Sequence, residues 1–366
     1  MEPDARQELS GKDCREIVQL LWRCRGPLLG GVLFFAASFS RAPLSFAEVA
    51  APIASETSPQ QWGRGPIRLA DQFPLALYHE SFAADSPAVL SPGELEVGGS
   101  FAWSNTVNRK GSSYLIDAEV RRLALEVSFA PMQHWEVGLQ VPVLWEGGGV
   151  LDSFIDGWHS VFALPDGPRN DPDIGEDEFE VRGDTYDRRR ASVEAPGTVV
   201  GDVTLENKWL FTEGGADAPA IAGSLAVRLP TGEDQLSQNG VDLLGTLLLS
   251  RRLGRLVGYA GVGYAFSSDL EQAGFRFEQH RLGGFFYGEW EAFDTISLLL
   301  GVQGGSNYVA NIERFPNYQL YLDLGLKIGL GSSSTLELLI RENPAPDQGT
   351  TDVTFLLGLT NRFLGL

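Results

Sequence analysis

The sequence predicts an all-β fold: an antiparallel transmembrane β-barrel of about twelve strands, with a short helix in one long extracellular loop. Three observations lead to this prediction. Apolar and polar side chains alternate over long segments, short and longer connections alternate between the segments, and aromatic residues gather near the segment ends. An alternation with a period of two places successive side chains on opposite faces of a strand, so one face of each strand is apolar.

Composition excludes several classes of protein. The 366 residues are 43% apolar and carry a net charge of −20, with a pI of about 4.6. Binding to nucleic acid needs clustered Lys and Arg, so we expect no nucleic-acid partner. No apolar run after the N-terminus reaches the roughly 20 residues that a membrane-spanning helix needs.

The N-terminus resembles an export signal, which we assign to residues 1–47. Arg23 and Arg25 precede an apolar run over residues 27–39, and Ser45-Phe46-Ala47 has the small-x-small form of a cleavage site. Cleavage there would remove both cysteines, at positions 14 and 24, and with them any disulfide or thiol chemistry. Residues 48–93 then form an N-terminal segment that we place inside or below the barrel.

Residues 94–363 are assigned to the barrel. Most of its strands are longer than the usual 5–6 residues of soluble proteins and match the roughly 9–11 that a tilted membrane strand requires. The twelve predicted strands are residues 94–105, 113–129, 134–145, 200–212, 219–230, 240–252, 256–267, 276–291, 294–306, 317–330, 333–342 and 351–363.

Connection lengths favour a barrel in the outer membrane of a Gram-negative bacterium. After the even-numbered strands the links are brief, whereas the others are longer and include a loop over residues 146–199. Short turns on one rim and long loops on the other, with an even number of strands, are typical of these barrels. Both termini would then be periplasmic. A secreted soluble β-protein, the alternative, gives no reason for loop lengths to sort by side.

Aromatic residues support the same conclusion because they lie near both ends of the strands, as interfacial girdles do. The residues near the long loops are Trp103, Tyr114, Trp145, Phe266 and Tyr318, and those near the short turns are Phe129, Trp135, Trp209, Phe211, Trp290 and Phe363.

The polar face of the strands would line the lumen. Charged side chains are tolerated there when they are paired or hydrated. The candidates are Glu96, Asp117, Glu119, Arg121, Glu136, Asp202, Glu206, Lys208, Arg228, Asp323, Lys327, Glu337 and Arg341. Twelve strands enclose a lumen wider than that of a filled eight-stranded barrel, so passage is feasible but easily blocked.

The long loop contains apolar residues at helical spacing, which predicts a short helix that carries Asp152, Trp158 and His159. A packed cap is one interpretation of this helix, and a membrane-lying or substrate-gripping helix is the other. Ser160 directly follows His159 and so points elsewhere, and no recognisable nucleophile context is present. The four histidines show no pair at zinc-ligand spacing. We therefore predict no enzyme activity, no metal and no cofactor.

Two sets of motifs resemble known barrels. Gly65-Pro66 with Gln72-x-Pro74-Leu75, the run from Gly147 to Asp152, and Leu164-Pro165-x-Gly167-x-Arg169 resemble an uncharacterised domain-of-unknown-function family of Gram-negative outer-membrane barrels, over most of residues 63–363. The pairs Gly201-Asp202 and Lys208-Trp209, followed by residues 228–232, are locally similar to barrels linked to aromatic-compound degradation, which are presumed to be uptake channels.

The leading functional hypothesis is a passive channel for a small uncharged or apolar molecule. The alternative is a structural or surface-interacting barrel whose lumen is sealed by residues 48–93 and the long loop, and a lipid-modifying enzyme ranks last. The expected partners are outer-membrane lipid and lipopolysaccharide, the barrel-assembly machinery and a small-molecule permeant.

Overall fold

The computed structural model describes residues 63–152, 154, 155, 157, 174, 178–215, 218–237, 240–268, 270–344 and 349–363. All of them belong to one compact unit, Thr57–Leu366. The predicted signal peptide and the first part of the N-terminal segment lie outside the described residues.

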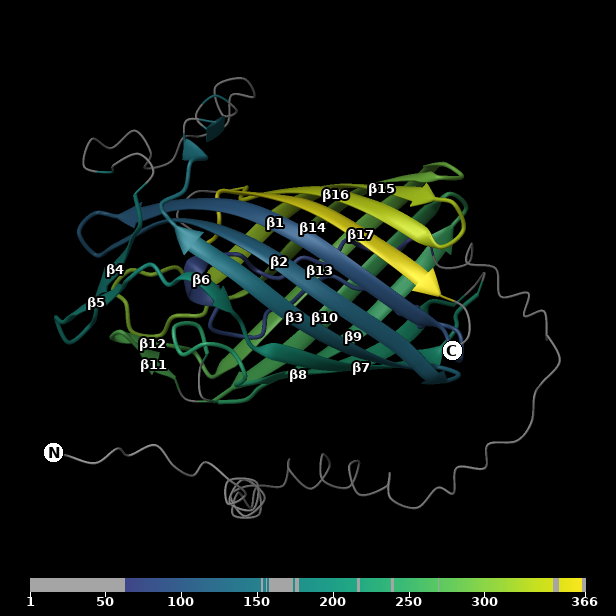
Figure 1. The fold of residues 1–366 in the computed structure, drawn as a ribbon, viewed down its shortest axis with the longest axis horizontal. Coiled ribbons are helices and arrows are strands. Elements are labelled where there is room, and N and C mark those ends of the chain that lie inside the picture. Colours follow the sequence, from purple (N-terminus) through teal and green to yellow (C-terminus); the bar gives the residue numbers. More distant parts are fainter. Residues whose placement is uncertain are drawn as a thin grey trace, which may run out of the picture. The chain divides into compact units, whose positions relative to one another are not determined.

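Twelve antiparallel strands close into a barrel in which β17 returns to pair with β1 (Figure 1). Neighbours in sequence are neighbours in the wall throughout, so the topology is up-and-down. The strands are β1 (Leu95–Lys110), β2 (Tyr114–Met132), β3 (Trp135–Gly147), β7 (Val203–Thr212), β8 (Ala220–Leu229), β9 (Asp242–Leu253), β10 (Leu256–Ser267), β13 (His280–Phe293), β14 (Ile296–Ser306), β15 (Tyr318–Leu330), β16 (Ser334–Glu342) and β17 (Val353–Phe363).

The predicted barrel of twelve strands is therefore confirmed, and the predicted strand ends agree to within about four residues except at the first hairpin. There β1 and β2 stay paired up to Lys110 and Tyr114, so a tight turn replaces the longer loop expected after the first strand. The polar run around Thr106 reads as a loop in the sequence, but its backbone groups are paired across the hairpin.

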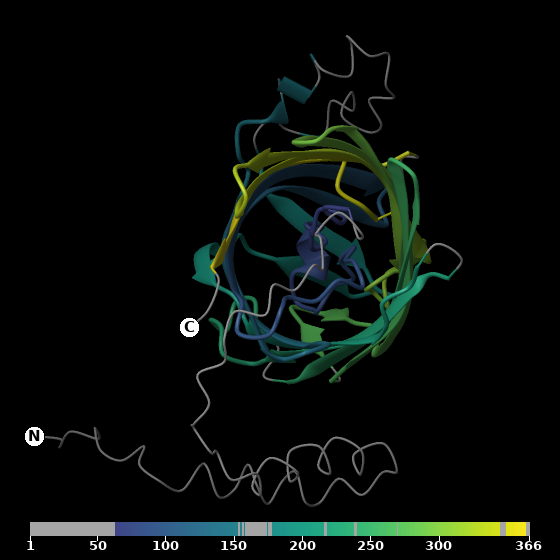
Figure 2. The same ribbon diagram turned by 90° about the vertical axis from the view of Figure 1, so that its right-hand side faces the viewer.

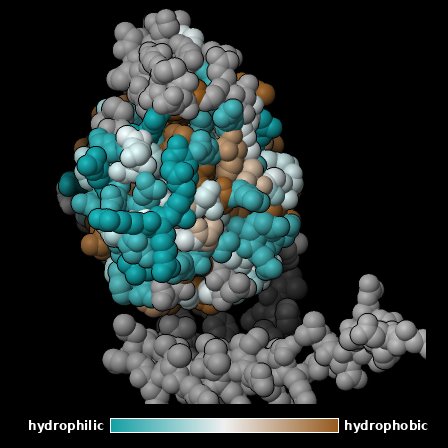
Figure 3. Space-filling view, turned by 90° about the vertical axis from the view of Figure 1, so that its left-hand side faces the viewer, coloured by the Kyte–Doolittle hydropathy of each residue, from teal (hydrophilic) through white to brown (hydrophobic). Residues whose placement is uncertain are grey.

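Short additional strands decorate the long-loop end. In the loop after β3, strands β4 (Glu180–Asp184), β5 (Arg190–Val193) and β6 (Gly197–Val200) extend the sheet, with β4 paired to β2 and β6 paired to β3. Between β10 and β13, strands β11 (Glu271–Gln272) and β12 (Phe275–Arg276) form a small ribbon. Figure 3 looks onto this end, where hydrophilic residues predominate on the visible face.

The outer wall of the barrel is apolar. On successive strands the exposed side chains share one parity and are large and hydrophobic, as expected for a surface covered by lipid. Examples are Leu125, Leu139, Val262, Phe286, Leu300, Leu324 and Leu357.

Residues 63–93 occupy the lumen as a hairpin-like segment, which we call the plug. Its first leg starts near the short-turn end, beside Glu289 of β13, and rises to the long-loop end. The 3-10 turn η3 (Pro74–Ala76) forms its tip, and the second leg returns to the short-turn end, where β1 begins. In the end-on view the plug lies within the ring of strands (Figure 2).

Helix is nearly absent from the part of the chain that the structure describes. The η3 turn is the one helical element with defined bounds there, and no helix is long and apolar enough to cross a membrane. In the long loop, Ile155 N donates to Leu151 O at 2.9 Å, which is a single helical turn. The remainder of the predicted loop helix falls largely outside the described residues.

Candidate functional site

The first leg of the plug is tied to the lumen wall by polar contacts. The backbone N–H of Arg64 donates to both carboxylate oxygens of Glu289, at 3.0 and 2.9 Å. Lys327 Nζ on β15 donates to the carbonyls of Arg64 and Pro66, each at 3.0 Å. Higher in the lumen, Tyr321 on β15 donates to Asp71 at 2.7 Å. These contacts hold the leg against the side of the barrel formed by β13 to β15.

The second leg is held from several directions. Gln303 Nε2 on β14 donates to Phe82 O at 2.9 Å. On the opposite side, Lys208 Nζ on β7 lies 3.2 Å from Asp85, and the N–H of Leu90 donates to Glu136 on β3 at 2.9 Å. Displacing the plug would therefore separate the buried Lys208–Asp85 ion pair, and leaving such a charge without its partner costs about 3–5 kcal/mol.

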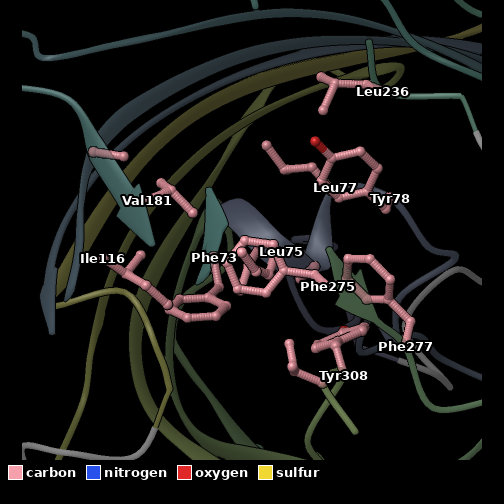
Figure 4. Close-up of a cluster of buried hydrophobic side chains, with 14 of the residues drawn as sticks. Phe73, Leu75, Leu77, Tyr78, Ile116, Val181, Leu236, Phe275, Phe277 and Tyr308 are labelled. Atoms are coloured by element: carbon pink, nitrogen blue, oxygen red, sulfur yellow. The ribbon is translucent and has the colours of Figure 1, made fainter. Parts of the chain in front are cut away.

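The tip of the plug enters an apolar cluster at the long-loop end. Phe73, Leu75 and Tyr78 pack there against Phe275, Phe277 and Tyr308 of the loops (Figure 4). Tyr114 and Ile116 of β2 belong to the same buried cluster, and the ring of Tyr114 lies 5.1 Å from that of Phe315. The mouth of the barrel is thus covered by aromatic and aliphatic side chains.

Glycines of the wall form a socket for Phe82. Gly263 on β10 pairs with Gly283 on β13, which pairs in turn with Gly305 on β14. A Cβ atom added at Gly283 would lie 2.4 Å from the Phe82 ring, and one added at Gly263 would lie 2.7 Å from it. Only glycine leaves room for this ring, so the second leg docks directly on backbone.

His79 lies beneath the tip, between Asp242, Ser267 and Arg281. Burial lowers the pKa of His79 to about 4, and the neighbouring Arg281 acts in the same direction. Both Ser267 Oγ, at 3.2 Å, and Asp242 Oδ2, at 3.5 Å, contact the same ring nitrogen, Nδ1. In a catalytic triad the serine and the acid bind opposite ring nitrogens. Because the His79 side chain is also 0% exposed, this cluster is not built as a hydrolase site.

A cavity of about 50 Å³ with both polar and apolar walls remains beside the plug. On one side it is lined by Arg68, Gln72, Glu80 and Ser81 of the plug. Its other side is the inner face of β1, β2, β3, β7 and β8, which contributes mainly small residues and a few charged ones: Ser100, Ala102, Arg122, Ala124, Glu126, Ser128, Gly138, Gln140, Thr204, Glu206 and Ala226.

Most predicted lumen residues are paired within the lumen. Besides the contacts described above, Arg228 bonds Asp202 at 3.1 Å, Lys327 bonds Glu337 at 2.7 Å, and Arg362 bonds Glu96 at 2.6 Å. Arg341 makes two 2.7 Å bonds to Asp323, and the side chains of both are at most 2% exposed. Glu206 bonds Arg68 of the plug at 2.6 Å.

Three of the candidates, Asp117, Glu119 and Arg121, lie on the outer face instead, so their assignment to the lumen is wrong. They share the parity of the exposed Leu125, and Arg121 stacks on the outward Trp103 at 5.0 Å. At this end of β2 the interior is apolar, because Tyr114, Ile116 and Val120 face the tip of the plug. The usual pattern of polar inside and apolar outside is therefore inverted beyond the apolar belt.

The start of the long loop covers these outward charges. Glu119 accepts hydrogen bonds from the N–H groups of Val150 and Leu151, at 2.8 and 2.9 Å. Asp152, a predicted loop residue, accepts one from Asn105 at 2.9 Å, so it lies on the outer wall. The other two predicted loop residues, Trp158 and His159, lie outside the described residues.

Sequence reasoning missed several inner-face residues on β2, β10 and β13. Arg122, Tyr259, Arg281, Tyr287 and Glu289 all point inward with the plug-facing parity. On β10 and β13 apolar residues occupy both parities, which hides the alternation. The sequence did carry a signal on β13. The large side chains of Phe286 and Trp290 are even-numbered and face outward, so the odd-numbered residues of this strand face the lumen.

Known structures share this barrel. The crystal structure of the COG4313 outer membrane channel from Pseudomonas putida F1 matches with a TM-score of 0.52 and 12% identity, over 75% of this chain and 97% of that chain. The translocator domain of the autotransporter NalP from Neisseria meningitidis gives 0.40 and 9%, over 75% and 90%. The Ralstonia pickettii toluene transporter TbuX gives 0.36 and 10%, over 76% and 92%.

No curated protein matches the chain in sequence. The fold is that of an outer-membrane β-barrel, as in the COG4313 channel. The model of one family, described as "Protein of unknown function (DUF3187)", matches residues 45–363. The chain therefore belongs to the DUF3187 family.

Proposed function

We propose that this protein is a passive outer-membrane channel for a small uncharged or apolar molecule, in which the plug narrows the lumen without filling it. The observation that carries the proposal is the cavity between the plug and the wall of β1 to β3, β7 and β8. A barrel of twelve strands is too wide for its own side chains to fill, and here a separate segment of the chain takes up most of the space.

The similarity to the COG4313 outer membrane channel supports the same proposal at the level of the fold. The ion pairs of the lumen also favour an uncharged permeant, because paired charges leave a weak net field. The apolar tip cluster at the mouth is compatible with an apolar molecule. Catalysis is not part of the proposal.

A sealed, non-transporting barrel is the second candidate. The tight docking of the plug on β10 to β15 favours it, through the Phe82 socket and the buried bonds to Glu289, Lys327 and Tyr321.

The placement of the chain in the cell is likewise proposed. We infer that residues 1–47 direct export and are removed, and that the barrel lies in the outer membrane with lipid and lipopolysaccharide around it. Leu95 pairs with Phe363 at the short-turn end, which we assign to the periplasm. Insertion would use the barrel-assembly machinery.

Reswelling of proteoliposomes after an osmotic shock tests the channel. We expect vesicles that contain the full mature chain to reswell in glycerol several-fold faster than empty vesicles, and to exclude raffinose. The matched control is the same protein unfolded by boiling before reconstitution. Reswelling at the empty-vesicle rate with every solute would establish the sealed barrel instead.

A further inference from the structure

The cavity beside the plug has the size and chemistry of a binding site. A buried water needs about 10–15 Å³ of such volume, so a cavity of about 50 Å³ has room for about three or four waters or for one solute of similar size. Small side chains on the wall, among them Ser100, Ala124 and Gly138, keep this space open. The two sides come from different parts of the chain, so a bound solute would touch both plug and wall.

One polar atom of the plug points to a ligand. The side chain of Gln72, which lines the cavity, is buried, with the residue only 2% exposed. Its Nε2 donates to Ala70 O at 2.8 Å, whereas its Oε1 has no hydrogen-bond partner among the described residues. A buried carbonyl oxygen without a partner costs about 1–3 kcal/mol. This oxygen is itself fully buried, so a solute that donates a hydrogen bond removes the cost only when the Gln72 side chain turns towards the cavity.

The charged groups around the cavity are already engaged with one another. Arg122 donates to Gln140 at 2.7 Å, and Gln140 donates in turn to Glu126 at 2.6 Å. Arg68 bonds Glu206 at 2.6 Å, and Thr204 donates to Glu80 at 2.7 Å. An ion would have to displace one of these partners, whereas a neutral solute can bind without doing so.

The opposite side of the plug is packed closely against the wall. There the Phe82 ring fills the glycine socket, and Ala84 and Val89 pack against Val257, Tyr259 and Phe285. The plug is therefore held by apolar packing and direct hydrogen bonds on the side of β10 to β15, and it is bounded by the cavity on the other side. A solute that passes a seated plug would take the side of β1 to β3, where the cavity lies.

We propose that this cavity is the selectivity site of the channel, and that it binds a small, neutral, hydrogen-bond-donating solute of the polyol or amide class. The inference rests on the proposed function and narrows it. On binding, the Gln72 side chain turns so that its Oε1 accepts a hydrogen bond from the solute, and the small wall residues set the size limit.

Filling the cavity tests the assignment. Ser100 pairs with Ala124 on one side and Gly358 on the other, so Ser100→Leu can extend into the cavity without meeting a large neighbour in the wall. We expect this variant to lower glycerol and urea permeation at least tenfold. Ser100→Ala, which keeps the space, should permeate like the wild type. Gly245→Leu, at a site with open space around the added Cβ, controls for an added leucine in the barrel.

A second variant tests the chemistry of the site. Gln72→Leu keeps a side chain of similar size without the acceptor, and we expect it to lower glycerol permeation several-fold. A difference in gel migration between boiled and unboiled samples checks that each variant forms a closed barrel. If Ser100→Leu does not form one, Ala124→Leu is used in its place.

The outcomes separate the two proposals. If the wild type passes no solute, the channel itself is refuted. If it passes glycerol and the cavity-filling variants pass it equally well, the channel stands and this site is refuted. Faster permeation of lactate than of glycerol would also refute the neutral-solute assignment.

Discussion

The substitution Gly283→Ala should loosen the plug without opening the barrel wall. The added Cβ would lie 2.4 Å from Cδ2 of Phe82 and 2.7 Å from two further ring atoms, whereas carbon atoms in contact need about 3.5–4.0 Å. Either the ring or the strand must move by about an ångström. Gly283 is paired on both sides, to Gly263 and Gly305, so we expect the ring to move.

The size of the effect follows from overpacking, which costs typically about 1–3 kcal/mol. Since about 1.4 kcal/mol is a factor of ten in an equilibrium constant, the undocked population of the second leg should rise roughly 5- to 150-fold. Hydrogen exchange by mass spectrometry reports this population from peptides that cover residues 80–92.

The matched control is Gly288→Ala on the same strand. An added Cβ there meets nothing within 4 Å, so exchange of the plug should stay at the wild-type rate. Equal protection of the plug in Gly283→Ala and Gly288→Ala would refute the claim that Phe82 docks the plug on this glycine socket.

Further predictions concern pH, charge, assembly and processing. Because burial lowers the pKa of His79 from 6.5 to about 4, the packed tip favours the neutral ring. The stability that the neutral ring gives to the tip is complete above about pH 6.5 and is lost as the pH falls towards 4. The protection factors of the amides at residues 77–81, which correct for the slower intrinsic exchange at low pH, should therefore be smaller at pH 5 than at pH 7. His79→Gln should remove this difference, and a wild-type tip with equal protection factors at both pH values would contradict the placement between Asp242 and Arg281. Asp323→Asn leaves Arg341, 1% exposed, without its anionic partner, and should destabilise the barrel by about 3–5 kcal/mol; an unchanged unfolding midpoint in denaturant would contradict the buried pair. Boiled and unboiled protein should migrate differently on detergent gels, and recovery in the soluble periplasm would exclude the membrane barrel. Intact-mass measurement should give a mature chain that starts at Glu48, and a mass that includes Cys24 would exclude the predicted cleavage.

Alternation alone predicts most of the barrel. On β3 the alternation places Val137, Leu139 and Val141 on the lipid face, and the inner Glu136 contacts Lys208 as a lumen residue should. The pattern works over this part of the strand because lipid covers one of its faces, whereas Leu144, nearer the long loop, faces the interior cluster.

The same rule fails where lipid no longer covers the strand. At the long-loop end of β2 the apolar Ile116 and Val120 face the plug, and the charged Glu119 lies outside beneath the long loop. The sequence of one strand cannot show this inversion, because it depends on residues 73–78 entering the barrel from a distant part of the chain.

The cavity was also beyond sequence reasoning. Ser100, Ala124 and Gln140 are unremarkable in their own strands, and they acquire a role only because Gln72 and Arg68 are brought opposite them. A lumen residue can be read from parity, but the space between wall and plug depends on how the plug is seated.

The central claim is that solute passes beside a seated plug, and a reversible lock tests it most directly. Because Phe82 Cγ would lie 2.7 Å from a Cβ at position 283, the two Cβ atoms would be within about 4.2 Å, which a disulfide spans. Phe82→Cys with Gly283→Cys, in a chain whose Cys14 and Cys24 are replaced by serine, can therefore fix the second leg to β13. Glycerol permeation is then measured on the same proteoliposomes, oxidised and after reduction. We predict that the oxidised protein still passes glycerol, within about twofold of the reduced protein. Permeation that stops on oxidation and returns on reduction would contradict the account, because it would show that the plug must leave the wall for solute to pass.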